Sequence, residues 1–228
     1  MIKISSKDIV DVLTYSDTKA IIVEKKPLMN TTQFKVSYSV VDFESKTKEV
    51  LTKNAYLLKK FGSSFKKISD AIPNFVQCDS AILYDRRILV VYPNGEAGIF
   101  DRDGELSWSG YFKYHDEIVY KCALDGKYFW SICPVENCAI RYSCQNMQVD
   151  LRLGGKDAST FINPTHICVD DGDVYVCSGG NRVRRIDKLN FTVSDYLSFD
   201  ETVKEFYKFG KYAIAVLSSG TYLLEDNG

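Results

Sequence analysis

Short apolar runs separated by tight polar turns follow one another along most of this chain. The recurring unit is an apolar run, a turn that contains Asp or Gly, and a second apolar run, as in residues 166–169, Asp171-Gly172 and residues 174–176. The second runs of five such units begin at residues 20, 88, 128, 174 and 212, which are 68, 40, 46 and 38 residues apart. This pattern predicts β-strands, and its spacing predicts five copies of one supersecondary unit.

Each unit extends beyond this first pair of strands. A further turn, such as Asn94-Gly95 or Ser219-Gly220, precedes a third apolar run, and fourth runs follow at residues 105–108, 148–151 and 192–196. Asn-Gly pairs between strands indicate hairpins, because type I′ turns need positive φ at both central positions. The chain is therefore predicted to be all-β, with four antiparallel strands in each unit.

This organisation resembles the β-propeller superfold over nearly the whole chain, since a propeller blade is a four-stranded antiparallel sheet of about 40 to 50 residues. The resemblance implies a single five-bladed domain over residues 1–228 and points to no particular family. The fifth unit stops after its third strand, whereas a surplus apolar stretch, Met1–Ile4, begins the chain. We therefore expect the N-terminal strand to join the last blade and close the ring. A β-sandwich is the alternative fold, because it too has many strands at short spacing.

One partly helical and basic insertion, at about residues 53–76, interrupts the strand pattern within the longest gap. Asn54 is predicted to cap a short helix over residues 55–61, which Gly62 would end, and residues 63–68 would form a second turn. The resemblance to propellers places this crossover on the face that carries the loops between second and third strands. That face usually binds partners, and loops of this length are often functional.

Two interpretations of the insertion remain open. In the first it forms a basic lip that binds an anionic ligand or an acidic protein surface through Lys59, Lys60, Lys66 and Lys67. In the second it is an amphipathic cover, because solvated lysine runs are common on protein surfaces. Its inward-facing side chains would then be Tyr56, Leu57, Phe61 and Phe65.

Composition and charge narrow the classes of partner. The chain has 29 Lys and Arg against 30 Asp and Glu, a formal charge of −1, so we expect neither nucleic acid nor a membrane as partner. Seven cysteines without any Cys-x-x-Cys pair, and a start without an apolar leader, predict free thiols in a reducing, cytoplasmic location. We expect a monomer.

No motif for catalysis, metal binding or a cofactor stands out. Cys133, Cys138 and Cys144 form the densest group of thiols, but a structural zinc site usually needs two pairs of closely spaced ligands. The acidic segments 101–105 and 170–173 resemble calcium loops only loosely, and Asp and Gly are expected there for turn formation. We therefore predict no metal, no cofactor and no assigned catalytic residue.

The first strand of each unit would line a central channel. Alignment of the units places a polar set at equivalent positions, namely Ser80, Tyr120, His166 and Lys204. These side chains would bind a small ligand or simply hydrate the channel. A five-bladed glycosidase is the enzymatic alternative, because such enzymes place two or three carboxylates in the channel. Candidates on or beside inner strands are Asp11, Asp79, Glu117 and Glu205.

The predicted function is a non-catalytic scaffold that binds a protein partner on the loop face. The prediction follows from the absence of a chemical motif and from a fold that commonly supports interactions, which is an analogy. The alternative is a carbohydrate-binding or glycoside-hydrolysing propeller, for which an exposed Trp108 would stack on sugar. Trp130 lies in the middle of a predicted strand, so we expect it in the core.

Overall fold

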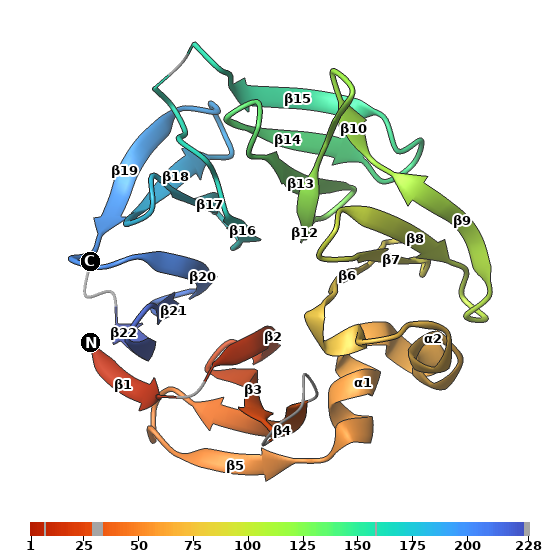
Figure 1. Cartoon of the computed structure of the whole chain (residues 1–228), viewed down its shortest axis with the longest axis vertical. Helices are drawn as coiled ribbons and strands as arrows, with labels where there is room; N and C mark the ends of the chain where they lie inside the picture. Colours follow the sequence, from red (N-terminus) through yellow and green to blue (C-terminus); the bar gives the residue numbers. More distant parts are fainter. Residues whose placement is uncertain (7, 29–33, 158, 226–228) are drawn as a thin grey trace.

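Five four-stranded antiparallel sheets form a closed ring in a computed structural model of the protein (Figure 1). The structure describes residues 1–228 except 7, 29–33, 158 and 226–228. Within blades 1 to 4 the strands run in chain order from the central axis outward. The chain is thus a five-bladed β-propeller, as its sequence pattern predicts, and not a β-sandwich.

The strands of the first three blades follow directly along the sequence. Blade 1 consists of β2 (Ile9–Ser16), β3 (Lys19–Pro27), β4 (Phe34–Asp42) and β5 (Lys48–Leu51). Blade 2 consists of β6 (Asp79–Ile82), β7 (Ile88–Val91), β8 (Glu96–Phe100) and β9 (Leu106–Tyr111). Blade 3 consists of β12 (Tyr120–Asp125), β13 (Tyr128–Cys133), β14 (Cys138–Ser143) and β15 (Val149–Gly154).

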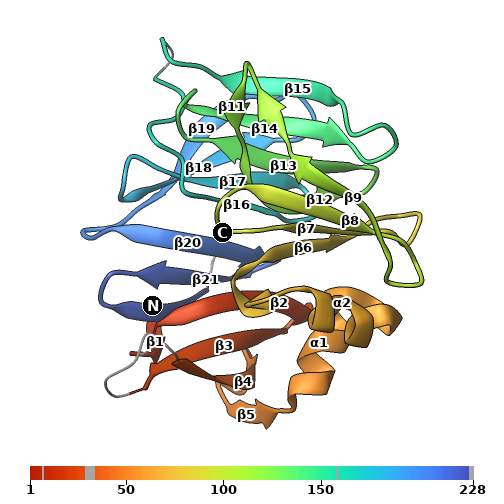
Figure 2. The same cartoon turned by 45° about the vertical axis from the view of Figure 1, so that its right-hand side comes forward.

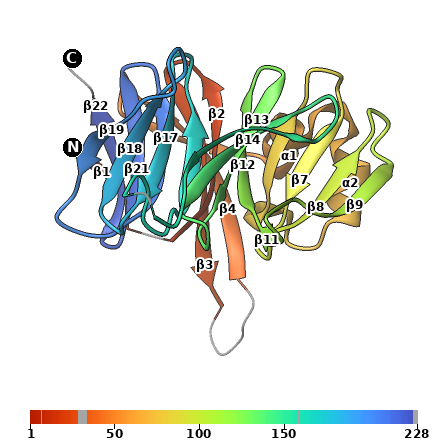
Figure 3. The same cartoon turned by 90° about the horizontal axis from the view of Figure 1, so that it is seen from above.

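The last two blades differ in how they are completed. Blade 4 consists of β16 (His166–Val169), β17 (Asp173–Ser178), β18 (Arg182–Asp187) and β19 (Val193–Ser198). Blade 5 contains β20 (Val203–Phe209), β21 (Tyr212–Leu217) and β22 (Gly220–Glu225), and its outer strand is β1 (Ile2–Ser5). Strand β1 pairs antiparallel with β22, with Ile2 opposite Leu223 and Lys3 opposite Tyr222. The predicted closure by the N-terminal strand is therefore confirmed, and Figure 3 shows β1 and β22 together at one side of the ring.

The hydrophobic core lies between the blades. Each of the five clusters of buried side chains lies between two neighbouring blades. In β21, for example, Tyr212 and Ile214 face blade 1, whereas Ala213, Ala215 and Leu217 face blade 4. Both faces of such a strand are buried, so it reads as a continuous apolar run rather than as an alternating one.

The insertion fills the interface between blades 1 and 2, as Figures 1 and 2 show. It contains the helices α1 (Lys53–Phe61) and α2 (Phe65–Ala71), joined by the 3-10 turn η1 (Gly62–Ser64), and a second 3-10 turn, η2 (Phe75–Gln77). Tyr56, Leu57, Phe61 and Ile68 are buried against Val23 of blade 1 and other side chains of both blades. The segment is therefore a wedge within the ring.

Two local details differ from the sequence-based expectations. Thr52, rather than Asn54, caps α1, because its Oγ1 accepts a hydrogen bond from the Ala55 N–H at 3.2 Å, and Gly62 ends the helix as predicted. An additional hairpin of β10 (Lys113–Tyr114) and β11 (Glu117–Ile118) was not predicted. Its turn residues His115 and Asp116 have φ values of 49° and 67°, a geometry usually signalled by Asn-Gly.

An aspartate lies at the end of the third strand of blades 1, 2 and 4, or directly after it, and has a structural role. The Oδ1 atoms of Asp42, Asp101 and Asp187 each accept two backbone N–H hydrogen bonds from the turn that follows. Segment 101–105 is thus a turn of this kind, as expected for Asp and Gly at that position.

Removal of strand β1 provides a test of ring closure. Deleting residues 1–5 exposes the edge of β22 and uncovers one side of blade 5, so we expect the melting temperature to fall by at least ~5 °C, at ~2–4 °C per kcal/mol for a chain of this size. Lys3→Ala, which keeps the backbone pairing, is the control. Equal melting temperatures for the truncated and full chains, measured by circular dichroism, would show that β1 does not stabilise the ring.

Candidate functional site

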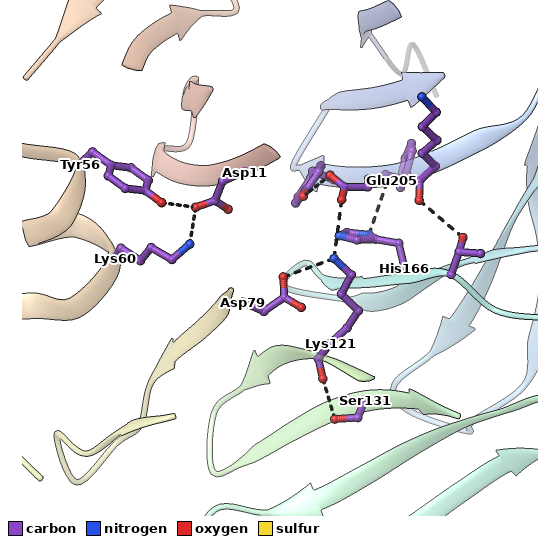
Figure 4. Close-up of polar contacts among 12 residues, drawn as sticks. Asp11, Tyr56, Lys60, Asp79, Lys121, Ser131, His166 and Glu205 are labelled. Atoms are coloured by element: carbon purple, nitrogen blue, oxygen red, sulfur yellow. Dashed lines mark hydrogen bonds and ion pairs between the residues drawn. The ribbon is translucent and has the colours of Figure 1, made fainter. Parts of the chain in front are cut away.

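Each blade contributes one ionisable side chain to a polar cluster around the central channel (Figure 4). All five stand on the innermost strands β2, β6, β12, β16 and β20, and they are Asp11, Asp79, Lys121, His166 and Glu205. Lys60 reaches the same region from α1. The ring thus brings together charges that are far apart in the sequence.

β-Bulges set which side chains face the channel. The strand register shifts between Ile9 and Asp11, between Tyr120 and Ala123, and between Val203 and Glu205. A bulge inserts an extra residue and re-aims the side chains beside it. Lys121 lies inside one of these irregular stretches, with a φ of 65°. Counting back from the hairpin turns therefore gives the wrong channel residue in blades 3 and 5, whereas β6 of blade 2 pairs with β7 in regular register.

The four predicted channel residues lie in different surroundings. His166 lies in the cluster, as predicted. Tyr120 lines a cavity at one mouth of the channel. Ser80 donates a hydrogen bond to the Lys60 carbonyl at 3.2 Å, and Lys204 is exposed beside a separate pocket with Lys25. The residues next to Ser80 and Lys204, which are Asp79 and Glu205, belong to the cluster instead.

Three of the four carboxylates predicted on or beside inner strands belong to the channel cluster. Asp11, Asp79 and Glu205, which the glycosidase alternative proposed, all belong to the channel cluster. Glu117 lies in the β10–β11 hairpin, not on an innermost strand. The two lysines of the cluster were not predicted, because a lysine on an inner strand or in a basic insertion carries no signal that distinguishes it from a solvated one.

Lys60 forms a buried ion pair with Asp11. Its Nζ lies 2.6 Å from Asp11 Oδ2, and Tyr56 Oη donates a hydrogen bond to the same oxygen at 2.7 Å. The Lys60 side chain is 0% exposed, so it is not available to a partner at the surface. The prediction that Lys60 forms part of a basic binding surface is therefore wrong. The reason is that helix α1 lies within the ring and directs its Lys60 side chain toward Asp11 at the channel.

The other lysines of the insertion are exposed, and some have partners on the protein itself. Lys67 forms an exposed ion pair with Glu105 at 2.7 Å, and Lys59 Nζ donates to the Tyr15 carbonyl at 3.3 Å. Lys66 is also exposed. The aromatic side of the insertion packs inward and most of its lysines face solvent, which is the arrangement of the amphipathic interpretation.

Lys121 lies between two carboxylates. Its Nζ is 3.5 Å from Asp79 Oδ1 and 3.6 Å from Glu205 Oε1, and Tyr207 Oη donates to the other Glu205 oxygen at 2.8 Å. Burial by itself would lower the pKa of Lys121, but Asp79 and Glu205 outweigh it and raise that pKa. Burial raises the pKa of the Asp79 carboxyl, and Lys121 offsets this only in part. Water still reaches 24% of the Asp79 side chain, since the channel is open.

His166 contributes a neutral ring. Burial lowers its pKa to about 3, and the positive charge of Lys121 acts in the same direction. Its Nδ1 accepts the Phe206 N–H at 3.4 Å, and its ring packs edge-on against Tyr207, with centroids 4.6 Å apart. Lys121 is therefore the basic group that lies between the two carboxyl groups of Asp79 and Glu205.

A cavity of about 330 Å³ opens at one mouth of this channel. Asp79 and Lys121 lie in its wall, together with the apolar and aromatic side chains Val91, Tyr92, Pro93, Tyr120, Ile132, Pro134 and Pro164. The remaining wall residues are Gln77, Asn163 and Thr165. Asp79, Val91, Tyr120, Lys121 and Ile132 stand on strands β6, β7, β12 and β13, and the other wall residues come from the β7–β8 and β13–β14 loops and from the crossovers before β6 and β16. The cavity therefore lies on the loop face, which we define as the face that carries these connections.

The cysteines are free thiols. Cys133 and Cys138 face each other across the β13–β14 hairpin, and a hydrogen bond from the Cys138 thiol lowers the pKa of Cys133 to about 7. Within the described residues, no group of three or more His, Cys, Asp or Glu side chains is arranged to hold a metal ion. No helix in the described ranges has the length and apolar character needed to cross a bilayer.

Comparisons with known proteins support the propeller fold and identify no family. No protein-family model matches the sequence, and no curated protein matches it either. The chain is similar to the computationally designed Ika8 protein, with a TM-score of 0.50 and 11% identity over 95% of this chain and 70% of that chain. It is similar to hydrazine synthase of Kuenenia stuttgartiensis, with a TM-score of 0.50 and 13% identity over 64% of this chain and 45% of that chain. At such low identity the likeness shows the fold alone.

The Lys60–Asp11 ion pair should stabilise the packing of helix α1 against blade 1. Lys60→Met leaves Asp11 buried without its cation, so we expect the free energy of unfolding to fall by ~3 kcal/mol. Asp11→Asn should also destabilise, and the double variant should lose at least ~1 kcal/mol less than the sum of the two, because the residues are in contact. Lys66→Met, at an exposed position, should change stability by no more than ~0.5 kcal/mol. Strictly additive losses in urea denaturation would contradict a direct interaction.

Proposed function

We propose that this propeller is a non-catalytic interaction scaffold that binds a protein partner on its loop face. The observation that carries the proposal is the cavity at the channel mouth, whose apolar rim encloses two charged side chains, Asp79 and Lys121. Concave sites with mostly apolar walls and a few fixed polar groups are typical of binding sites. In this proposal a protruding side chain of the partner enters the cavity, and the surrounding loops contact the rest of its surface.

The basic insertion plays a smaller part in this proposal than the sequence suggested. Lys60 is buried, and Lys67 already has Glu105 as a partner. An exposed ion pair of this kind contributes little to stability, so Lys67 can exchange Glu105 for another acidic group at small cost. We further propose a reducing compartment such as the cytoplasm, in keeping with seven free thiols.

Blocking the cavity tests the proposed function. Thr165→Trp places an indole at an exposed wall position of the cavity, and we expect it to abolish partner capture from extracts of the source cell, measured by affinity purification and quantitative mass spectrometry. Asp171→Trp, at an exposed turn on the opposite face, is the matched control and should retain capture. A partner captured equally by both variants binds elsewhere and contradicts the proposal.

Carbohydrate binding is the second candidate function, and one exposed aromatic surface favours it. A groove of about 600 Å³ between blades 2 and 3 is lined by Trp108, Tyr111 and the amide side chains Gln145, Asn146 and Gln148 among others. Trp108 is 39% exposed, and its ring lies over Gly110, where a Cβ atom would be 2.8 Å from it. An aromatic face beside amide donors and acceptors suits a sugar ring. Trp130, by contrast, is buried in the core as predicted.

A glycan array combined with a hydrolysis assay distinguishes this second candidate. If the groove binds sugar, Trp108→Ala should reduce the array signal at least about tenfold, because it removes the stacking surface, while Tyr15→Ala, an exposed aromatic in blade 1, should leave it unchanged. The absence of any bound glycan, or equal binding by the Trp108→Ala variant, eliminates this candidate. Release of sugar would show instead that the protein is a glycosidase.

A further inference from the structure

The charges at the bottom of the loop-face cavity are unequal. Lys121 contacts Asp79 and Glu205 at once, so one ammonium serves two carboxylates. Asp11 does not share Lys121, because Lys60 and Tyr56 already bind it. His166 adds no positive charge at neutral pH, because burial holds its pKa at about 3. Around Lys121 the carboxyl groups therefore outnumber the basic groups by two to one.

Asp79 is the carboxylate that a ligand in the cavity would meet. It lines the cavity, whereas Glu205 lies behind Lys121 and is hydrogen bonded by Tyr207. Only one Asp79 oxygen, Oδ1, faces Lys121, at 3.5 Å, and no other side chain in the described part of the chain forms an ion pair with this carboxylate. Its second oxygen is thus available to a donor from outside.

The side chains that line the cavity beside Asp79 suit an aliphatic chain that contacts aromatic rings. Tyr92 and Tyr120 offer ring faces, and Pro93, Pro134 and Ile132 offer apolar surface. A Lys or Arg side chain buries its methylene stem along such surface while its charged end seeks a polar partner, and cations are attracted to aromatic faces. About 330 Å³ accommodates one extended side chain and lies at the small end of ligand cavities.

We propose that the loop-face cavity recognises an alkylammonium or alkylguanidinium group, presented as a Lys or Arg side chain of the protein partner. That the cation belongs to a protein partner rests on the proposed function. The preference of the cavity for a cation rests on the residues of the cavity alone. An anion is disfavoured, because Lys121 is already paired with Asp79 and Glu205 and an incoming anion would meet these two carboxyl groups.

The test uses three small probes of similar length on the full chain. They are n-butylguanidinium, the neutral 1-pentanol and the anionic pentanoate, and binding is measured from amide chemical shifts in two-dimensional NMR. We expect butylguanidinium to bind at least about tenfold more tightly than pentanol, with shifts at Asp79, Tyr92 and Thr165, and pentanoate to bind most weakly. The proposal is overturned if pentanol binds as tightly as butylguanidinium, or if pentanoate binds more tightly. This comparison uses the unaltered protein and does not depend on any variant.

Two variants test the role of each charge. Asp79→Asn should weaken butylguanidinium binding at least about tenfold, whereas Asp17→Asn, at the opposite mouth of the channel, should not change it. Lys121→Met removes the competing ammonium and should strengthen butylguanidinium binding. Weaker binding of this probe by the Lys121→Met variant contradicts the proposal. Unchanged binding in Asp79→Asn contradicts the proposal.

The two proposals fail in distinguishable ways. If the guanidinium probe binds but Thr165→Trp does not reduce partner capture, the cavity recognises a free amine or guanidine and the protein-partner function is wrong. If Thr165→Trp abolishes capture while the probes show no preference for the cation, the scaffold function stands and the charge selectivity proposed here is wrong.

Discussion

Every blade of this propeller depends on having a neighbour on each side. The strands in the middle of a blade are apolar on both faces, as β21 shows by directing alternate residues toward blades 1 and 4. A blade at the end of an open array would expose one of these faces to water, at a cost of roughly 25 cal/mol for each Å² of apolar surface. Closure of the ring removes that exposed face, and strand β1 joins the two ends of the chain in one sheet.

The same constraint explains the insertion. Blades 1 and 2 are separated by α1 and α2, whose aromatic side chains complete the interface that the other blades form by direct contact. A helix inside the ring must direct part of its surface toward the channel, and Lys60 occupies that position. A buried ammonium is tolerated only beside a partner, which Asp11 provides from the innermost strand.

Closure also creates the candidate site. Five innermost strands place Asp79, Lys121 and Glu205 within reach of one another, although up to 126 positions separate them in the chain. None of these charges would lie near another in the unfolded protein. Asp79 and Lys121 of this group line the loop-face cavity beside apolar side chains, and a charge interaction is stronger where apolar walls limit the access of water.

The sequence alone was sufficient for the strands and turns of the five blades, the number of blades and closure by the N-terminal segment, because apolar runs and turn residues are local signals. It also predicted the buried side of the insertion. It did not predict the β10–β11 hairpin, whose turn lacks the usual Asn-Gly pair. It did not determine which side chains face the channel, since bulges beside Asp11, Lys121 and Glu205 shift a strand by one residue and so reverse its facing. Only the closed ring decided that Lys60 is a buried partner of Asp11 rather than a surface lysine, because that depends on contacts between residues 49 positions apart.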